Sequence, residues 1–282
     1  MSDTPGFSPA EHANTSTVLV LGSASPARAK TLRAAGIEPL IRVSNADEDA
    51  VLAQFENATS AHQAAQKVMA LAKVKAASVA QALTATEIAD FSRQQGMPAP
   101  ASAIVVGCDS MLEVNGALVG KPHSPEVAVS RIRELSGNDV VLHTGHAITL
   151  LHVEYDSATS PGGSNNGPTG LTILDTRYDS CATTVHFTDL DEDEIRAYVA
   201  TGEPLEVAGA FTIDSLGGAF IAGVTGDPHS VVGISLPLLR QITKELGVFW
   251  PGLWNKQRAV ATHEQGEGLT PEILRPSLPL FG

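Results

Sequence analysis

The chain has 282 residues, of which 43% are hydrophobic and 17% charged, as is typical of a globular protein with a sizeable core. Its 31 acidic and 18 basic residues give a formal net charge of −13 without a basic stripe, which argues against a nucleic-acid partner. No apolar run approaches the ~20 residues of a membrane span, no signal peptide is visible, and Cys108 and Cys181 lie far apart. We therefore expect a cytoplasmic protein that binds neither nucleic acid nor membrane.

The N-terminal third of the chain predicts strands that alternate with helices. Apolar residues from Ala61 to Val79 recur every three or four positions, which is typical of a long amphipathic helix, and Ser60 is its expected N-cap. In chain order we predict a disordered leader at 1–16, a strand at 17–22, a helix at 27–35, a strand at 39–44, the long helix at 60–81 and an irregular connection at 84–102.

The rest of the chain predicts longer strands and further helices. The strongest hairpin signal is Asn115-Gly116. We predict strands at 102–110, 140–155, 172–187, 211–215 and 217–224, a hairpin at 111–120, helices at 124–135, 192–201 and 236–247, a flexible loop at 157–170, and a C-terminal extension at 248–282 that wraps the surface. Strands alternating with helices indicate an α/β fold, and the long central strands favour a mixed sheet.

The turn between the first strand and the first helix has the features of an anion site. Gly22, Ser23, Ser25 and Pro26 would aim backbone N–H groups, hydroxyls and the positive end of a helix at one point, and Arg28 follows closely. The spacing differs from that of a P-loop. An alternative stays open, in which Ser25 simply caps a helix that starts at Pro26.

Two lysines and an aspartate are further candidates. Lys75 borders the apolar face of the long helix, where a lysine either reaches solvent or meets an anion in a cleft. Asp109 is expected at the C-terminal tip of its strand, where the ligand crevices of α/β sheets lie, although aspartate also starts ordinary turns. Lys121 follows the hairpin, and both interpretations apply to it as well.

Acidic residues in two loops are candidate metal ligands. Mg²⁺ prefers carboxylates together with substrate phosphates, and the acidic loop Asp47-Glu48-Asp49 and the turn at Asp227 could supply them, with Asp47 and Asp227 as the candidates. An acidic run is more often a solvated surface, and the run at 189–194 is assigned to helix capping. His143 and His146 share a strand without a third ligand nearby in sequence, so we expect them to be structural.

In order and spacing, these residues resemble the Maf family of nucleoside triphosphate pyrophosphatases, named for an association with septum formation. The family's L-A-S-x-S-P-x-R appears as LGSASPAR, its L-A-x-x-K-A as LAKVKA, and its G-A-D-T-x-V as GCDSMLEV. The further blocks are VSNADED, VGKP, ELSG, YVATGEPLEVAGAF and GDPHSVVG. The resemblance covers residues 17–247, and so many ordered blocks make it specific.

The resemblance implies a single elongated α/β domain with a mixed central sheet and two lobes around a cleft. It implies hydrolysis of a nucleoside triphosphate to the monophosphate and pyrophosphate, assisted by a divalent metal cation (Mg²⁺ or Mn²⁺), and a homodimer. Asp109 aligns with the family's proton acceptor, and Lys75 and Lys121 with catalytic cleft residues. The implied substrate contacts are Ser23, Ser25, Arg28, Ser110, Glu203 and Asp214, and the candidate metal ligands are Asp47 and Asp227.

The residue types suit this chemistry. Attack of water on the α-phosphorus builds negative charge on the pyrophosphate leaving group, which Lys75, Lys121 and Arg28 would neutralise while the metal bridges phosphate oxygens. Asp109 would orient or deprotonate the water. An unperturbed aspartate, with a pKa of about 3.9, is a weak base, so the metal is expected to share this task.

Four residues depart from the family pattern. Ala27 replaces an arginine of the branch that acts on dTTP and UTP, and the branch that acts on 7-methyl-GTP also lacks that arginine. Ser110 stands for the usual threonine, Asp214 for a glutamine associated with base recognition, and Val207 for a lysine. Because Asp214 and Val207 change the charge of the wall that faces the base, neither branch's substrate transfers to this chain.

Two classes of function stay open at this point. The first is a metal-dependent pyrophosphatase that clears modified or non-standard nucleotides. The second is a non-catalytic nucleotide-binding regulator of cell division on the same scaffold. The intact positions of Asp109, Lys75 and Lys121 favour the enzyme, and turnover across a nucleotide panel would separate the two classes.

Overall fold

A mixed seven-stranded sheet forms the centre of the computed structural model, which describes residues 16–55, 61–156 and 167–255. The strand order is β2-β1-β3-β5-β6-β7, with β4 paired to β3. β1 pairs in parallel with β2 and β3, and the other pairings in the described part are antiparallel. The strands are β1 (Ser16–Leu21), β2 (Leu40–Ile41), β3 (Pro100–Val114), β4 (Ala117–Val119), β5 (Asp139–Tyr155), β6 (Pro168–Phe187) and β7 (Ile221–Thr225).

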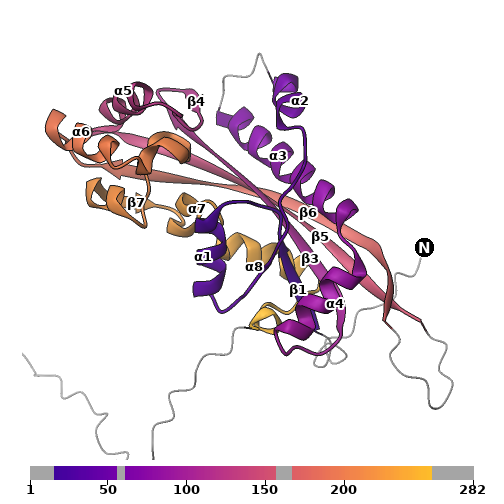
Figure 1. The fold of residues 1–282 in the computed structure, drawn as a ribbon. Coiled ribbons are helices and arrows are strands. Elements are labelled where there is room, and N and C mark those ends of the chain that lie inside the picture. Colours follow the sequence, from indigo (N-terminus) through magenta and orange to yellow (C-terminus); the bar gives the residue numbers. More distant parts are fainter. Residues whose placement is uncertain (1–15, 56–60, 157–166, 256–282) are drawn as a thin grey trace, which may run out of the picture.

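Helices cover both faces of this sheet, as Figure 1 shows. Within the described residues they are α1 (Pro26–Ala34), α2 (Glu48–Leu52), α3 (Ala61–Ala82), α4 (Ala85–Gln94), α5 (Pro125–Leu135), α6 (Glu192–Ala200), α7 (Pro228–Val232) and α8 (Leu236–Glu245). None of these helices alone is long and apolar enough to cross a membrane, and only α3 and α4 together, bent by 90° at their junction, have the length and composition of a span.

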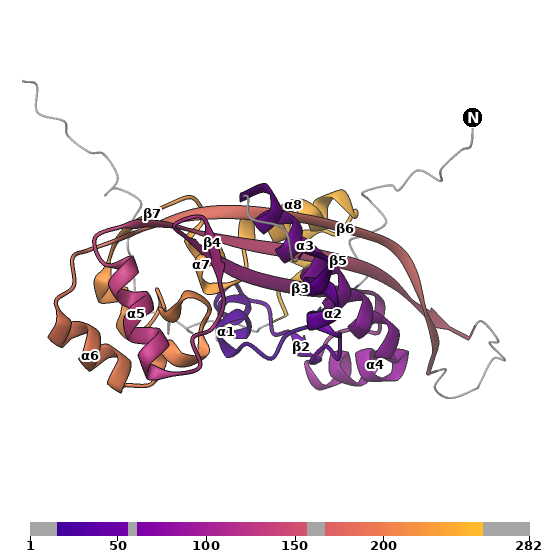
Figure 2. The same ribbon diagram turned by 90° about the horizontal axis from the view of Figure 1, so that it is seen from above.

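The alternation of side chains along β1 explains why both faces are covered. Leu19 and Leu21 pack with α1 and α8, whereas Val18 and Val20 pack with α3 and α4 on the opposite face. These elements and the adjoining half of the sheet form the large lobe. The small lobe contains β4, β7, α5, α6 and residues 203–220, and it has apolar clusters of its own. Figure 2 shows α5 and α6 side by side at the far end of the long strands. The expected elongated α/β domain with two lobes is confirmed.

Two glycines allow α3 to lie unusually close to the sheet. A Cβ atom on Gly107 of β3 would stand 2.7 Å from the backbone nitrogen of Ala76 and closer still to the carbonyl oxygen of Ala72. A Cβ atom on Gly145 of β5 would stand 2.6 Å from the backbone nitrogen of Met69. Real Cβ atoms do not approach backbone this closely, so only glycine permits this contact of helix and sheet.

The sheet has a gap along one edge of β3. β1 pairs with β3 only as far as the register pair Leu21–Val106, and β4 begins to pair at Leu112. On the other side, β5 pairs with β3 without interruption from Ser102 to Glu113. Asp109 therefore lies inside a long strand, and its predicted place at a strand tip is wrong. The predicted tip corresponds to the point where β3 is no longer paired with β1 on one side.

Two further predictions of secondary structure were wrong. Residues 84–102 contain α4, which starts with a capping box: the N–H of Glu87 donates to Thr84 Oγ1 (3.2 Å), and the N–H of Thr84 donates to the Glu87 carboxylate (2.9 Å). Residues 211–215 form no strand, because the carboxylate of Glu203 holds this segment in a turn.

Other elements are present with shifted limits. The strand predicted at 39–44 has two residues, and the strand predicted at 217–224 begins at Ile221, after a 3-10 turn. The helices α2 and α7 were not predicted, and each has only five residues. The predicted leader was 1–16, but Ser16 begins β1; the rest of the leader, the cap at Ser60, most of the loop at 157–170 and the tail from 256 lie outside the described residues.

The start of the C-terminal extension packs on the large lobe. Leu253 is 1% exposed and belongs to the same core cluster as α8. Trp254 lies against Gly36 at the end of α1. The side-chain amide of Asn255 accepts a hydrogen bond from the N–H of Glu38 (2.7 Å) and donates one to its carbonyl oxygen (3.0 Å). Residues 248–255 are therefore built into the fold.

The close contact of α3 can be tested by the substitution Gly107→Ala. The added methyl group meets backbone atoms that cannot rotate away, so we expect a loss of about 1–3 kcal/mol in the free energy of unfolding. In a protein of this size each kcal/mol lowers Tm by roughly 2–4 °C, which thermal unfolding measures. The control is Gly223→Ala in β7, where an added Cβ meets no atom within 4 Å. An equal Tm for the two variants would contradict the close contact.

Candidate active site

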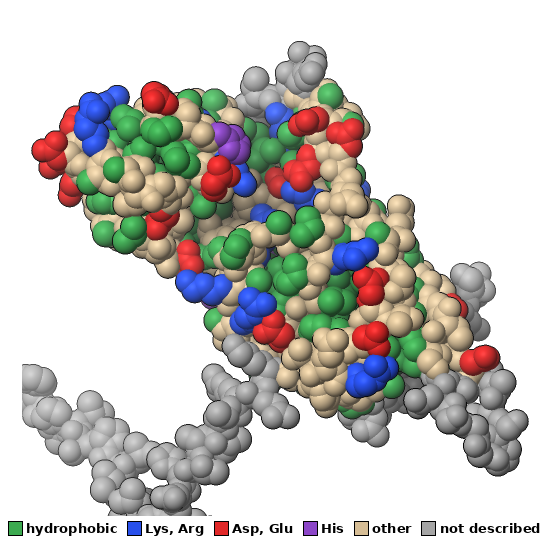
Figure 3. All heavy atoms as spheres, viewed as in Figure 1, with side chains coloured by type: hydrophobic (Ala, Val, Ile, Leu, Met, Phe, Trp, Pro, Cys, Tyr) green, Lys and Arg blue, Asp and Glu red, His purple; other side chains and the backbone are tan. Residues whose placement is uncertain are grey.

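A cleft of about 790 Å³ opens at the gap beside β3, between the two lobes. Figure 3 shows it as a hollow, with lysine and arginine atoms at its base. The predicted residues that line it are Ser23, Ser25, Arg28, Lys75, Asp109, Ser110, Lys121 and Asp214. Ala27 and Val207, which depart from the family pattern, line it too. The structure does not bring the predicted residues Asp47, Glu203 and Asp227 to its wall.

Lys75 joins two carboxylates in the cleft. Its Nζ atom lies 2.6 Å from Asp109 Oδ1 and 2.9 Å from Glu48 Oε2. The side chains of Lys75 and Asp109 are only 12% and 14% exposed, so this ion pair is largely shielded from water. Burial raises the pKa of Asp109 above its ordinary value, although the charges of Lys75 and Arg28 oppose this effect. A carboxylate with a raised pKa is a better base than an exposed aspartate.

Glu48 belongs to the acidic run at 47–49, from which Asp47 was the predicted metal ligand. It stands one residue after the predicted Asp47, on the first turn of α2, and it faces Lys75. Asp47 instead caps α2, since its carboxylate accepts the N–H of Ala50 (3.0 Å). The acidic residues at the start of a helix were a usable signal for Glu48. The side chain of the cap residue bonds to the first turn of the helix, whereas the side chain of the next residue points in a different direction.

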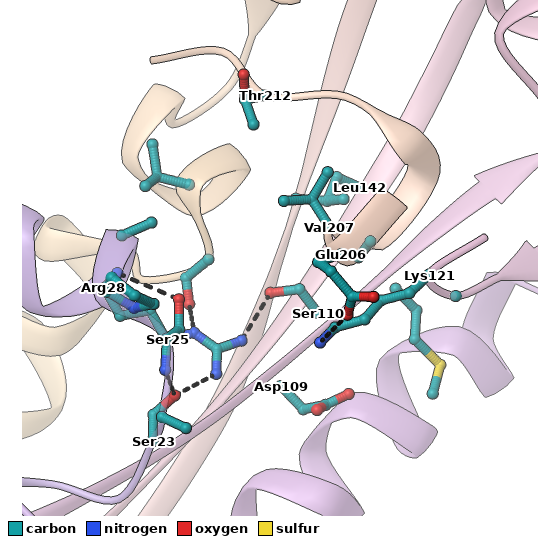
Figure 4. Close-up of a pocket in the computed structure, with 18 of the residues that line it drawn as sticks. Ser23, Ser25, Arg28, Asp109, Ser110, Lys121, Leu142, Glu206, Val207 and Thr212 are labelled. Carbon is teal, nitrogen blue, oxygen red and sulfur yellow. Dashed lines mark hydrogen bonds and ion pairs between the residues drawn. The ribbon is translucent and has the colours of Figure 1, made fainter. Parts of the chain in front are cut away.

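The Arg28 guanidinium forms hydrogen bonds to three separate segments of the chain (Figure 4). Its Nε donates to the carbonyl of Gly233 (2.8 Å), and its Nη1 donates to Ser23 Oγ (3.1 Å) and to the carbonyl of Cys108 (2.9 Å). Its Nη2 donates a long bond to Ser110 Oγ (3.4 Å). A guanidinium has five N–H groups, so these bonds leave a single donor for a ligand. The positive charge of the Arg28 guanidinium remains at the cleft, which Arg28 lines.

The turn at 22–26 supports both interpretations made from the sequence. Ser25 caps α1, because its Oγ accepts the N–H of Arg28 (3.4 Å), and Pro26 opens the helix. Ser23 Oγ accepts the N–H of Ser25 (3.2 Å) as well as Arg28 Nη1. Since both of these partners are donors, the hydroxyl proton of Ser23 stays available to an acceptor in the cleft.

Charged pairs surround the mouth of the cleft. Lys30 of α1 and Asp214 of the small lobe meet at 2.9 Å and thereby link the two lobes. On the opposite side, Lys121 and His123 lie 3.7 and 3.6 Å from the carboxylate of Glu206. Lys121 is half exposed and loosely paired, so its ammonium group can turn to an anionic ligand.

Asp227 and the two histidines stabilise the structure around the cleft. Asp227 caps α7, with Oδ1 accepting the N–H of His229 (3.0 Å), and this helix ends at Gly233, the partner of Arg28. His146 accepts the N–H of Ser235 at the start of α8 (2.8 Å), and burial and the nearby Arg28 charge lower its pKa to about 3. His143 pairs with Glu113 (2.9 Å). No group of three or more metal-binding side chains occurs among the described residues.

Glu203 organises the loop that forms one wall of the cleft. Its carboxylate accepts hydrogen bonds from five groups of the small lobe: the hydroxyls of Tyr198, Thr212 and Ser215 and the N–H groups of Leu216 and Gly217. Burial alone would raise the pKa of Glu203, but these hydrogen bonds outweigh burial and lower the pKa to about 2. Glu203 therefore supports the lining residues Thr212, Ile213 and Asp214 from behind.

The substitution Glu203→Gln should lower Tm at pH 7, because an amide cannot accept all of these hydrogen bonds. A carboxyl group whose pKa is lowered in the folded state stabilises the protein above its unfolded pKa, and this contribution fades as the pH falls. The Tm difference between wild type and variant should therefore shrink between pH 4.5 and pH 2, the two pKa limits of this carboxyl. The exposed Glu126→Gln on α5 is the control. A Tm difference that does not change with pH would contradict this role.

Comparisons with known proteins identify the family of this chain. Residues 18–246 match the family described as Maf-like protein. The chain is 45% identical over 238 residues to a protein of Nocardia farcinica named nucleoside triphosphate pyrophosphatase, covering 84% of this chain and 97% of that protein. Proteins with the same name from Rhodococcus jostii and Saccharopolyspora erythraea are 43% and 45% identical, covering 84% and 83% of this chain and 96% of each relative. The chain therefore belongs to the Maf family.

Proposed function

We propose that this protein hydrolyses a nucleoside triphosphate to the nucleoside monophosphate and pyrophosphate. The names of its relatives support this activity. The observation that carries the proposal is the buried contact of Lys75 with Asp109 and Glu48, in a cleft large enough for a nucleotide. It combines a carboxylate of raised pKa with a fixed cation, and this pair suits the attack of water on a phosphoanhydride.

The chemistry can be assigned to the chain's own residues. A water molecule attacks the α-phosphorus, its proton passes to the Asp109 carboxylate, and the bond from the α-phosphorus to the bridging oxygen breaks. That oxygen leaves with pyrophosphate, and the ammonium groups of Lys75 and Lys121 offset its growing charge. The Ser23 proton is directed to a phosphate oxygen. Arg28 adds charge from beneath and holds Ser23 and Ser110 in place.

The residues of the cleft fit a divalent cation. Mg²⁺ sites that serve phosphate substrates use one or two protein carboxylates, and the substrate and water supply the other ligands. Asp109 and Glu48 provide two carboxylates within ion-pair distance of one ammonium group, and these two side chains would hold the ion. When bound, Mg²⁺ or Mn²⁺ would supply Lewis-acid polarisation of the phosphate oxygens.

The base is expected to lie toward the apolar part of the cleft. Ala27, Val207 and Ile213 line it, and Asp214 is held by Lys30 at its mouth. This wall carries a carboxylate and no free lysine, so we expect a base preference that differs from both known branches. Clearance of modified or non-standard nucleotides, in a reducing cytoplasm where Cys108 and Cys181 stay free thiols, is the cellular role that we propose.

The activity is tested by product analysis with a panel of nucleotides and Mg²⁺ or Mn²⁺. Wild type should release pyrophosphate and not orthophosphate. Asp109→Asn removes the base and should lower kcat by about 10²–10⁴-fold with Tm maintained. Asp90→Asn removes an exposed carboxylate on α4 and should leave kcat unchanged. Full turnover by Asp109→Asn would refute the assignment of the base, and absence of turnover by wild type would favour a nucleotide-binding regulator.

The metal site is tested by removing the ion and by two neighbouring substitutions. Treatment with a chelator should abolish turnover, and added Mg²⁺ or Mn²⁺ should restore it. Glu48→Gln should raise the metal concentration needed for half-maximal activity by about tenfold or more. Asp47→Asn should not, since asparagine still caps α2. A larger rise for Asp47→Asn than for Glu48→Gln would show that Asp47, and not Glu48, contacts the metal.

A further inference from the structure

A buried hydroxyl group lies directly behind Ser110. Thr144 of β5 is opposite Ser110 in the β3–β5 pairing and is 0% exposed. Its Oγ1 lies 3.0 Å from Ser110 Oγ and 2.9 Å from the carbonyl oxygen of Ser230 in α7. Thr144 belongs to no block of the family pattern and does not touch the cleft. It joins a cleft residue to the helix that ends at Gly233.

The direction of these hydrogen bonds follows from the number of protons. A carbonyl oxygen can only accept, so Thr144 donates its single hydroxyl proton to Ser230. Thr144 then has no proton left for Ser110. The bond of 3.0 Å between the two hydroxyls must therefore be donated by Ser110, and the Ser110 proton points into the sheet and away from the cleft.

Toward the cleft, Ser110 Oγ can only accept a further hydrogen bond. Arg28 Nη2 can only donate, and it occupies one lone pair of Ser110 Oγ. One lone pair stays open on a side chain that lines the cleft (Figure 4). Ser23 is the opposite case, because it accepts two N–H groups and keeps its proton. The two serines thus present opposite hydrogen-bonding character to a ligand.

We propose that Thr144 is a positioning residue that makes Ser110 a hydrogen-bond acceptor toward the substrate. Ser110 thereby selects nucleotides that place an N–H or O–H group opposite Ser110 Oγ. The oxygens of a triphosphate are mostly deprotonated near neutral pH and act as acceptors, so within the substrate the donor that faces Ser110 is a sugar hydroxyl or an N–H of the base. A ligand that offers an acceptor there leaves two lone pairs in contact and is rejected.

This inference rests on the proposed function and is tested with the same pyrophosphate assay. Thr144→Val removes the acceptor of the Ser110 proton, which then turns toward the cleft. The contact with the substrate is made in both the ground state and the transition state, so KM should rise about five- to tenfold while kcat stays within about twofold. Thr144→Ser keeps the hydroxyl and should restore KM. The panel contains the four ribonucleotides and their 2′-deoxy forms, which separates a sugar donor from a base donor.

A matched control lies on the same strand. Thr149 is also buried, and its hydroxyl pairs with Thr176 away from the cleft (3.1 Å). Thr149→Val should leave KM unchanged, although it also removes a buried hydroxyl. Tm is measured for every variant. A KM for Thr144→Val within twofold of wild type, or an equal rise for Thr149→Val, would overturn the proposal.

Ser110→Ala tests the proposal independently of whether Thr144→Val folds. It removes the acceptor, so it should weaken discrimination within the panel, and full retention of discrimination would refute the role of Ser110. In the Ser110→Ala background, Thr144→Val should add no further rise in KM, whereas additive effects would show that Thr144 acts elsewhere. If wild type shows no turnover, the proposed function fails. The same variants then test the inference through nucleotide Kd by calorimetry, where equal Kd values for Thr144→Val and wild type overturn it.

Discussion

The contact between α3 and the sheet determines where the chemistry of this protein lies. Gly107 and Gly145 let the backbone of α3 touch the backbone of β3 and β5, and three alanines fill the remaining space. Between Ala72 and Ala76, the α3 residues that touch Gly107, Lys75 meets Asp109 at 2.6 Å in a shielded position. A helix held farther away by ordinary side chains would place the ammonium group several ångströms from the carboxylate, and water would enter between them. The raised pKa of Asp109 depends on that exclusion of water.

The second constraint is the gap beside β3. A strand whose edge is paired along its whole length offers no room for a ligand, and an open edge is normally protected. Here β1 ends at Leu21 and β4 begins to pair at Leu112, so only a short middle stretch is uncovered. The turn after β1 leads into α1, and its groups lie beside this stretch. The cleft thus has two sources, an interrupted edge and the capping groups at the start of a helix.

Much of this arrangement can be predicted from the sequence, because alternation, helical periodicity and caps are local signals. They predicted the mixed sheet, α3 and the turn at Ser25 in nearly the observed places. The prediction was wrong where a tertiary contact decides: Asp109 lies inside a strand because β5 continues past it, and residues 211–215 turn because Glu203 holds them. It missed α4, although the capping box of Thr84 and Glu87 and the amphipathic segment after it are both local signals of a helix.

For the site residues, too, part of the result can be predicted from the sequence and part depends on the fold. A motif identifies residues near a ligand, but the hydrogen bonds already made in the fold determine what each one can still do. Arg28 uses four of its five N–H groups inside the protein, and the Glu203 carboxylate already accepts five hydrogen bonds from the small lobe. The hydrogen-bonding groups left for a ligand are the ammonium groups, one N–H of Arg28, the Ser23 proton and the Ser110 lone pair. Buried neighbours that belong to no motif, such as Thr144, therefore contribute to selectivity without touching the substrate, because they decide which way a proton points.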